Sequence, residues 1–132
     1  MDYTLTIRIN LPYAEALVLT REALAAEGFG VPTELDTQAV FKAKLGLDTE
    51  RRVILGACLP KVAYEALQAE PGIAALLPCN VVVREVVGGT EICAVKPTAL
   101  LSLSGKLPRS EAEGVEHALQ RVLHRLQRST NP

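Results

Sequence analysis

Two apolar segments joined by a pair of glycines constrain the fold of this chain more than any other feature. Residues 81–87 and 90–96 flank Gly88-Gly89, and two glycines between apolar segments are typical of the tight turn of a β-hairpin. The first segment has valines at both alternating positions, for example Val82 and Val83. A strand with one face in water alternates more regularly, so we expect both faces of this hairpin to be covered.

The rest of the chain alternates between strand and helix patterns. Pro12 and Pro60 suit the first turn of a helix, Asp36 suits a helix N-cap, and Ser110 with Glu113 forms a capping box for the last helix. We expect strands at residues 3–10, 30–35 and 52–58, and helices between residues 12 and 28, 36 and 46, 60 and 69, and from residue 110 onward.

These elements describe one α+β domain over residues 1–132. The first and last helices are long enough to cover one face of a single-layer, mostly antiparallel sheet of four or five strands, with short helices in the loops. The opposite face then needs a cover, and the commonest one is a twofold copy of the same chain. We therefore expect a homodimer, and short helices around Phe41 and Leu67 are the alternative cover.

Charge and composition argue against two classes of partner. The 132 residues carry a net charge of −1 and only 4% are aromatic, whereas a nucleic-acid surface needs clustered basic and stacking aromatic side chains. No apolar segment approaches the roughly 18 residues of a membrane span, and the N-terminus lacks the pattern of a signal peptide. We expect no nucleic acid, no membrane and a cytoplasmic location, where three cysteines stay reduced.

Two cysteines mark the most reactive candidate site. Cys58 ends an apolar strand just before the helix that starts near Pro60, and backbone N–H groups at a helix start stabilise a thiolate. Cys79 begins the next strand, so the two thiols are expected to meet at one edge of the sheet beside the turn at Asp36. We expect a ligand-binding pocket there, lined by Asp36, Cys58, Lys61, Cys79 and Asn80. The alternative is that both cysteines are packing residues, as Cys93 on the hairpin is expected to be.

Other candidate motifs carry no chemistry. His117 and His124 lie seven residues apart on one helix, about 10 Å by helical rise, which is too far to share a metal ion. Ser104-Gly105-Lys106 lacks the earlier glycine and the following hydroxyl residue of a phosphate-binding loop. We expect no metal and no cofactor, and assign no catalytic residue.

Several of these segments resemble one known family. Leu35-Asp36, residues 42–46, residues 54–60 and residues 77–81 are similar to the bacterial and archaeal family called domain of unknown function 302, closely over about residues 29–97. The resemblance implies a fold like that of the TATA-binding protein, with the order strand, helix, four strands, helix. Members often have Asn where this chain has Leu59, and Asp-Pro where it has Lys96-Pro97. The biochemical role of the family is not established.

Three functions remain open at this point. The first is a non-catalytic homodimeric module that binds a small ligand or a protein partner. The second is a thiol-dependent enzyme or redox sensor that uses Cys58, resolved by Cys79. The third is a purely structural role in assembly. We take the first as the leading hypothesis.

Overall fold

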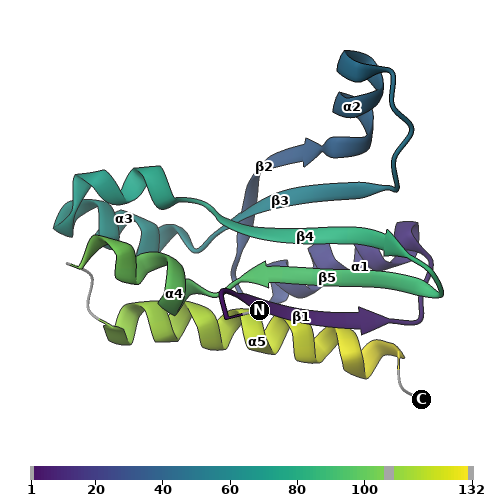
Figure 1. Ribbon diagram of the computed structural model, residues 1–132. Coiled ribbons are helices and arrows are strands. Elements are labelled where there is room, and N and C mark those ends of the chain that lie inside the picture. The colour runs from purple at the N-terminus through teal and green to yellow at the C-terminus, as the bar shows by residue number, and fades with distance from the viewer. Residues whose placement is uncertain (1, 106–108, 131–132) are drawn as a thin grey trace.

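The chain folds around one antiparallel sheet of five strands in the order β1-β5-β4-β3-β2 (Figure 1). The structure is a computed structural model that describes residues 2–105 and 109–130. The strands are β1 (Thr4–Ile9), β2 (Gly30–Asp36), β3 (Arg52–Cys58), β4 (Cys79–Val86) and β5 (Gly89–Val95). The order of the main elements is the one that the family resemblance implies, with two strands placed on each side of β4.

The β4–β5 hairpin is confirmed, with Val86 paired to Gly89 across the turn. Gly88 has a φ of 86°, which an L side chain rarely adopts. A Cβ on Gly89 would lie against the carbonyl oxygen of Ile9, so this glycine also lets β5 approach the end of β1 closely. β4 begins at Cys79, two residues earlier than expected, because its pairing with β3 extends to Ala57.

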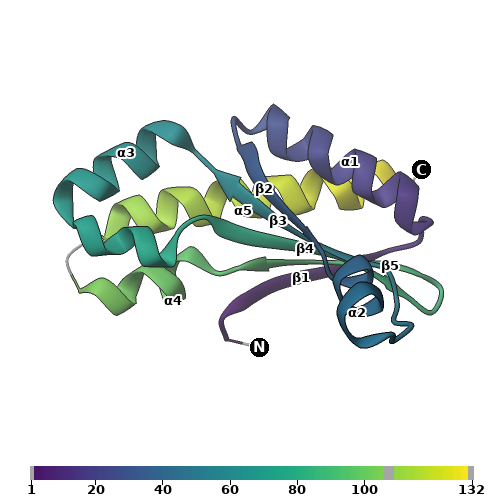
Figure 2. The same ribbon diagram turned by 90° about the horizontal axis from the view of Figure 1, so that it is seen from above.

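Two long helices cover one face of the sheet, α1 (Tyr13–Ala26) and α5 (Arg109–Thr130) (Figure 2). The apolar residues that repeat along α5 at steps of three and four are buried against this face, as the sequence predicts. The largest fully buried side chains of the main core are Leu24, Leu55, Val81, Val83, Ile92, Leu119, Val122 and Leu126.

The remaining helices are short: α2 (Thr37–Leu45), α3 (Pro60–Ala69), η1 (Pro71–Leu76), α4 (Pro97–Leu101) and η2 (Ser102–Ser104). Asp36 caps α2 as expected, because its Oδ1 accepts a hydrogen bond of 3.0 Å from the backbone N–H of Ala39. The expected N-cap at Ser110 is wrong. The helix already includes Arg109, whose side chain bonds Glu113 one turn later at 2.8 Å.

The face of the sheet opposite α1 and α5, which we call the open face, has no covering element among residues 2–105 and 109–130. Side chains alternate along each strand, so Val81 and Val83 are buried under the helices while Val82 points to the open face. Neither short helix covers Val82: α2 stands at the β2 edge (Figures 1 and 2), and α3 packs with η1 and α4 beyond the end of the strands. The described part of the chain therefore leaves the second face of the hairpin without a covering layer.

Within the described residues, no helix is both long enough and apolar enough to cross a membrane.

Candidate functional site

The register of the sheet brings Cys58 and Cys79 to the same end of neighbouring strands. Ala57 pairs with Cys79 across β3 and β4, so Cys58 lies one residue beyond that pair. The expected place of the two cysteines, together at one end of the sheet, is confirmed. The chain then turns through Leu59 into α3, whose first residue is Pro60.

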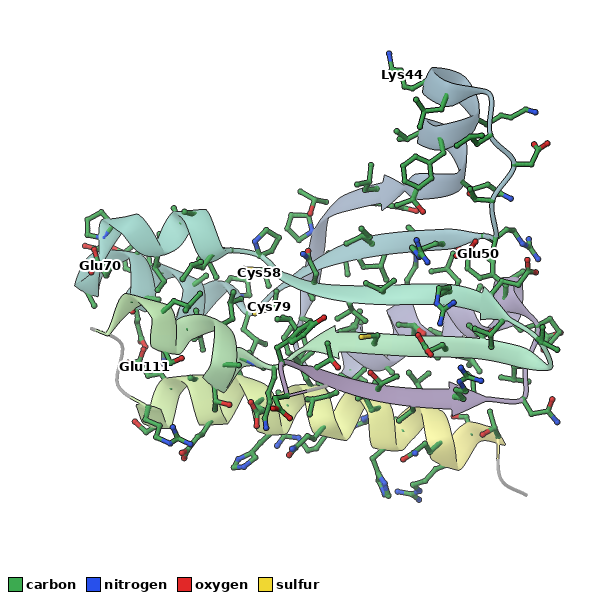
Figure 3. The ribbon with its side chains drawn as sticks, in the orientation of Figure 1. Lys44, Glu50, Cys58, Glu70, Cys79 and Glu111 are labelled. Carbon is green, nitrogen blue, oxygen red and sulfur yellow. The ribbon has the colours of Figure 1, made fainter. Side chains whose placement is uncertain are left out.

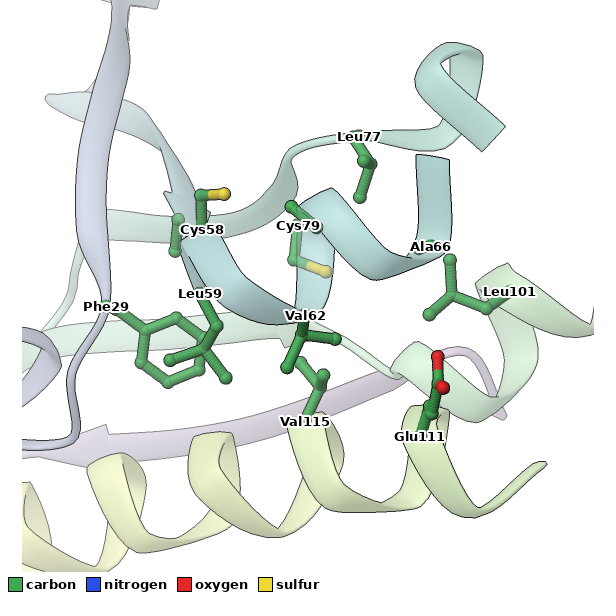
Figure 4. Close-up of a pocket in the computed structure, with 12 residues that line it drawn as sticks. Phe29, Cys58, Leu59, Val62, Ala66, Leu77, Cys79, Leu101, Glu111 and Val115 are labelled. Atoms are coloured by element: carbon green, nitrogen blue, oxygen red, sulfur yellow. The ribbon is translucent and has the colours of Figure 1, made fainter. Parts of the chain in front are cut away.

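A narrow apolar pocket lies at this end of the sheet, between β3, α3, α4 and the start of α5 (Figure 4). Its enclosed volume is about 30 Å³, so any ligand larger than one or two waters must displace side chains. The lining residues are Phe29, Ala57, Cys58, Leu59, Val62, Ala63, Ala66, Leu77, Cys79, Leu101, Glu111 and Val115.

The pocket lies where two hydrophobic clusters meet. Phe29, Cys79 and Val115 belong to the main core between the sheet and the long helices. Ala66 and Leu101 belong to a smaller cluster formed by α3, η1, α4 and the start of α5. Residues of both clusters therefore form the wall of the pocket.

The thiol of Cys79 is poorly suited to nucleophilic chemistry. Only 5% of Cys79 is exposed, and this burial, with a smaller contribution from Cys58, raises its pKa from 9.0 to about 11. A thiol with that pKa is almost entirely protonated at neutral pH.

Cys58 and Cys79 also point to different sides of the strands. Since Cys79 is paired with Ala57, it shares the helix-covered face with that residue, and the next residue, Cys58, points the other way. Figure 4 shows the Cys79 sulfur directed toward Val62, while the Cys58 side chain lies farther from Val62. This arrangement does not favour a bond between the two sulfurs.

One carboxylate lies at the wall of the pocket. Glu111, in the first turn of α5, reaches toward Leu101 (Figure 4), and none of the described residues forms a hydrogen bond or an ion pair with it. It is the one charged side chain among the described residues of the lining. A ligand in this pocket would therefore meet apolar groups on most sides and an acceptor on one.

Comparisons with known proteins identify the family of the chain. The family model described as domain of unknown function DUF302 matches residues 5–126. The chain belongs to this family. A solved structure of an uncharacterised conserved DUF302 protein from Bacillus stearothermophilus is 29% identical, with a TM-score of 0.86 over 96% of this chain and 99% of that one. No curated protein matches the sequence.

Asp36 does not belong to the pocket of this DUF302 chain, and the expectation that it lies beside the cysteines is wrong. β2 and β3 are antiparallel, so Gly30 pairs with Cys58 whereas Asp36 pairs with Val53 at the other end of the strands. Five residues of extended chain separate Val53 from Cys58, roughly 17 Å. The Asp36 carboxylate caps α2 instead.

Lys61 and Asn80 do not line the pocket either. Lys61 is exposed on α3. Asn80 pairs with Gly56 and points to the open face, where it lines a shallow groove of about 640 Å³ together with Thr6, Val82 and Cys93. Of the five expected residues, the structure therefore gathers only the two cysteines at one pocket.

Sequence reasoning missed most of the pocket wall. Val62, Ala66 and Val115 fit an ordinary inward helical spacing, which does not distinguish a pocket from a core. Leu101 lies on α4, an element that the sequence analysis did not predict. Among residues 2–105 and 109–130, no three His, Cys, Asp or Glu side chains form a group that could hold a metal ion.

Proposed function

We propose that this DUF302 chain is a non-catalytic, homodimeric module that binds a small, mainly apolar molecule in the pocket between β3, α3 and α5. The observation that carries the proposal is the pocket itself. It has apolar walls, one carboxylate, that of Glu111, to which none of the described residues bonds, and a position between two hydrophobic clusters. Binding sites for small molecules are commonly concave and apolar, with few polar groups that fix orientation.

The protonation of Cys79 supports binding rather than catalysis. A thiol with a pKa of about 11 behaves at neutral pH as a small apolar side chain, so it adds to the wall of the pocket. The thiol-dependent alternative needs Cys79 to attack or resolve an oxidised Cys58, and both its pKa and its direction oppose that role. The expected cytoplasmic location is part of the proposal, since a reducing compartment keeps the thiols reduced.

Binding can be tested with simple probes before a natural ligand is identified. We expect benzene and short alkanols to shift the backbone amide resonances of Ala57, Val62 and Val115 in ¹⁵N-labelled protein, because these residues line the pocket. The substitution Ala66→Leu fills the pocket from α3 and should abolish these shifts. Ala25→Leu is the matched control, because Ala25 is exposed on α1.

The outcome is decided by where the shifts occur. Saturable shifts at the pocket that Ala66→Leu removes and Ala25→Leu keeps would support a ligand site. Shifts spread over the surface, or equal in both variants, would refute it. An enzyme would instead show Cys58 alkylation far faster than that of a free thiol at neutral pH.

The homodimer rests on the uncovered open face. Val82 and Ile54 lie there, half-buried by neighbouring side chains, and none of the described helices forms a second layer over them. A twofold partner is the simplest layer that would complete this face. Sedimentation equilibrium of the full chain tests this part separately from ligand binding, and a monomer at all micromolar concentrations would refute it.

A further inference from the structure

We propose that a second copy of this chain binds the open face and the arm formed by residues 35–47 as one continuous surface. The inference rests on the homodimer proposed above and specifies where its interface lies. The arm consists of the end of β2, helix α2 and the first residues of the following loop. Figures 1 and 2 show α2 rising from the β2 edge on the side of the open face, away from α1 and α5.

The arm has too little packing of its own to explain its composition. In α2, only Thr37 is buried. Four aliphatic side chains of the arm are exposed: Leu35 by 47%, Val40 by 40%, Leu45 by 64% and Leu47 by 53%. A helix of nine residues is marginal in water, since most helical stability in proteins comes from packing an apolar face. Figure 3 shows Lys44 at the tip of α2, far from the pocket at Cys58 and Cys79. The exposed aliphatic side chains of the arm therefore have little packing against the described residues, and a second copy of the chain would supply it.

The open face continues the apolar surface of the arm. Leu35 pairs with Ile54, Ile54 with Val82, and Val82 with Cys93, so these side chains form one row across four strands. The row leads from the base of the arm into the groove of about 640 Å³. A partner that contacts the arm thus meets an apolar strip that extends to the middle of the sheet.

The charges beside this strip are already paired within the chain. The Arg84 guanidinium donates to Glu91 at 3.0 Å, and Arg8 approaches the same carboxylate at 3.6 Å. A partner can cover the neighbouring apolar row without having to neutralise these groups. An apolar centre with a polar rim is the usual arrangement of a protein interface.

The size of the surface fits a second copy only if the arm takes part. Five strands spaced by about 4.8 Å and seven residues long give a face of roughly 570 Å². A standard interface buries about 800 Å² from each partner, so the face alone is too small and the arm supplies most of the remainder. In a twofold dimer, the same surface of both copies forms the interface, so the strip and the arm of one copy contact the strip and the arm of the other. Such an interface closes the assembly at two copies.

The test is sedimentation equilibrium of the full chain and of two single variants. Leu45→Glu places a charge on the arm, and we expect it to raise the dimer dissociation constant at least 100-fold. Val87→Glu is the control, because Val87 is fully exposed at the hairpin turn, and strand β3 separates the hairpin from β2 and its arm. It should leave the dissociation constant within about twofold. Circular dichroism establishes that both variants keep the fold, which is expected because both side chains are largely exposed.

Each outcome supports or overturns a specific claim. A dimer that Leu45→Glu dissociates and Val87→Glu keeps supports the proposed surface. A dimer that Leu45→Glu leaves intact overturns the surface while the homodimer itself stands. A monomeric wild-type chain overturns both the proposed surface and the homodimer, even if the arm binds a different protein. The proposal of a ligand pocket is tested separately by the amide resonances.

Discussion

Gly56 provides a quantitative test of how tightly β3 is packed between its neighbours. It pairs with Thr33 on one side and Asn80 on the other. A Cβ at this position would overlap the Thr33 hydroxyl oxygen and lie 2.5 Å from Cγ of Pro78. Contacts this short do not occur in folded proteins, so Gly56→Ala forces Thr33 or the Pro78 ring to move.

The expected cost follows from two opposing effects. Overpacking a filled site costs about 1–3 kcal/mol, and the loss of glycine flexibility in the unfolded chain returns about 0.4–1 kcal/mol. Because both overlaps are severe, we expect the overpacking cost to lie in the upper part of its range, about 2–3 kcal/mol. The net effect of Gly56→Ala is then a loss of about 1–2 kcal/mol in the free energy of unfolding. With an unfolding entropy of about 2.1 cal/mol/K per residue, this corresponds to a fall in Tm of roughly 4–7 °C at fixed protein concentration.

Three further variants separate steric overlap from a general effect of alanine. Gly114 in α5 has no atom within 4 Å of the position of an added Cβ, so Gly114→Ala should stabilise the chain by about 0.5–1 kcal/mol. Adding Thr33→Ala to Gly56→Ala removes one of the two overlaps and should restore part of the loss, whereas Thr33→Ser should not. Urea unfolding followed by circular dichroism measures all of these. If Gly56→Ala is as stable as the wild type, the inferred packing at β3 is wrong.

Three other measurements test separate features. Cys79 should resist iodoacetamide at pH 8 until the chain unfolds, because burial raises its pKa to about 11; rapid modification in the native state would contradict this. Hydrogen bonds from Arg121 and then Arg125 lower the pKa of Glu27, so the unfolded state binds more protons and this stabilisation is lost as the pH falls below about 4.5. In urea titrations, Glu27→Gln should therefore be less stable than the wild type at pH 7, with a smaller difference at pH 3. Leu119→Ala should cost about 2–5 kcal/mol because the side chain is fully buried, and a cost below 1 kcal/mol would contradict its place in the core.

The features that the sequence predicted correctly depend on residues close together in the chain. Gly88-Gly89 places the hairpin turn, and Asp36 caps α2 through Ala39 three residues away. The spacing of apolar residues along α5 likewise identifies the buried side of that helix. In each case the physical cause, a backbone conformation or a helical period, lies within one element.

The site was predicted less well because it depends on how distant elements pair. The meeting of Cys58 and Cys79 required only that β3 and β4 be antiparallel neighbours. Asp36 was misplaced because the antiparallel pairing of β2 with β3 puts Gly30, and not Asp36, beside Cys58. The local sequence pattern does not indicate the direction in which two strands pair. Glu111 was missed since a carboxylate in the first turn of a helix is already explained by the helix dipole.

The pairing of β1 with β5 has a consequence for how this chain is made. Thr4 lies opposite Val95, and α1 packs with α5. The contacts of Glu27, at the C-terminal end of α1, with Arg121 and Arg125 of α5 join positions more than ninety residues apart. Contacts between segments this distant form late and slow the folding of a domain. During synthesis, β1 cannot pair until β5 has been made. The apolar side of α1, which also packs on β2 and β4, is not fully covered until α5 has been made. The native core is therefore completed only after α5 has emerged from the ribosome.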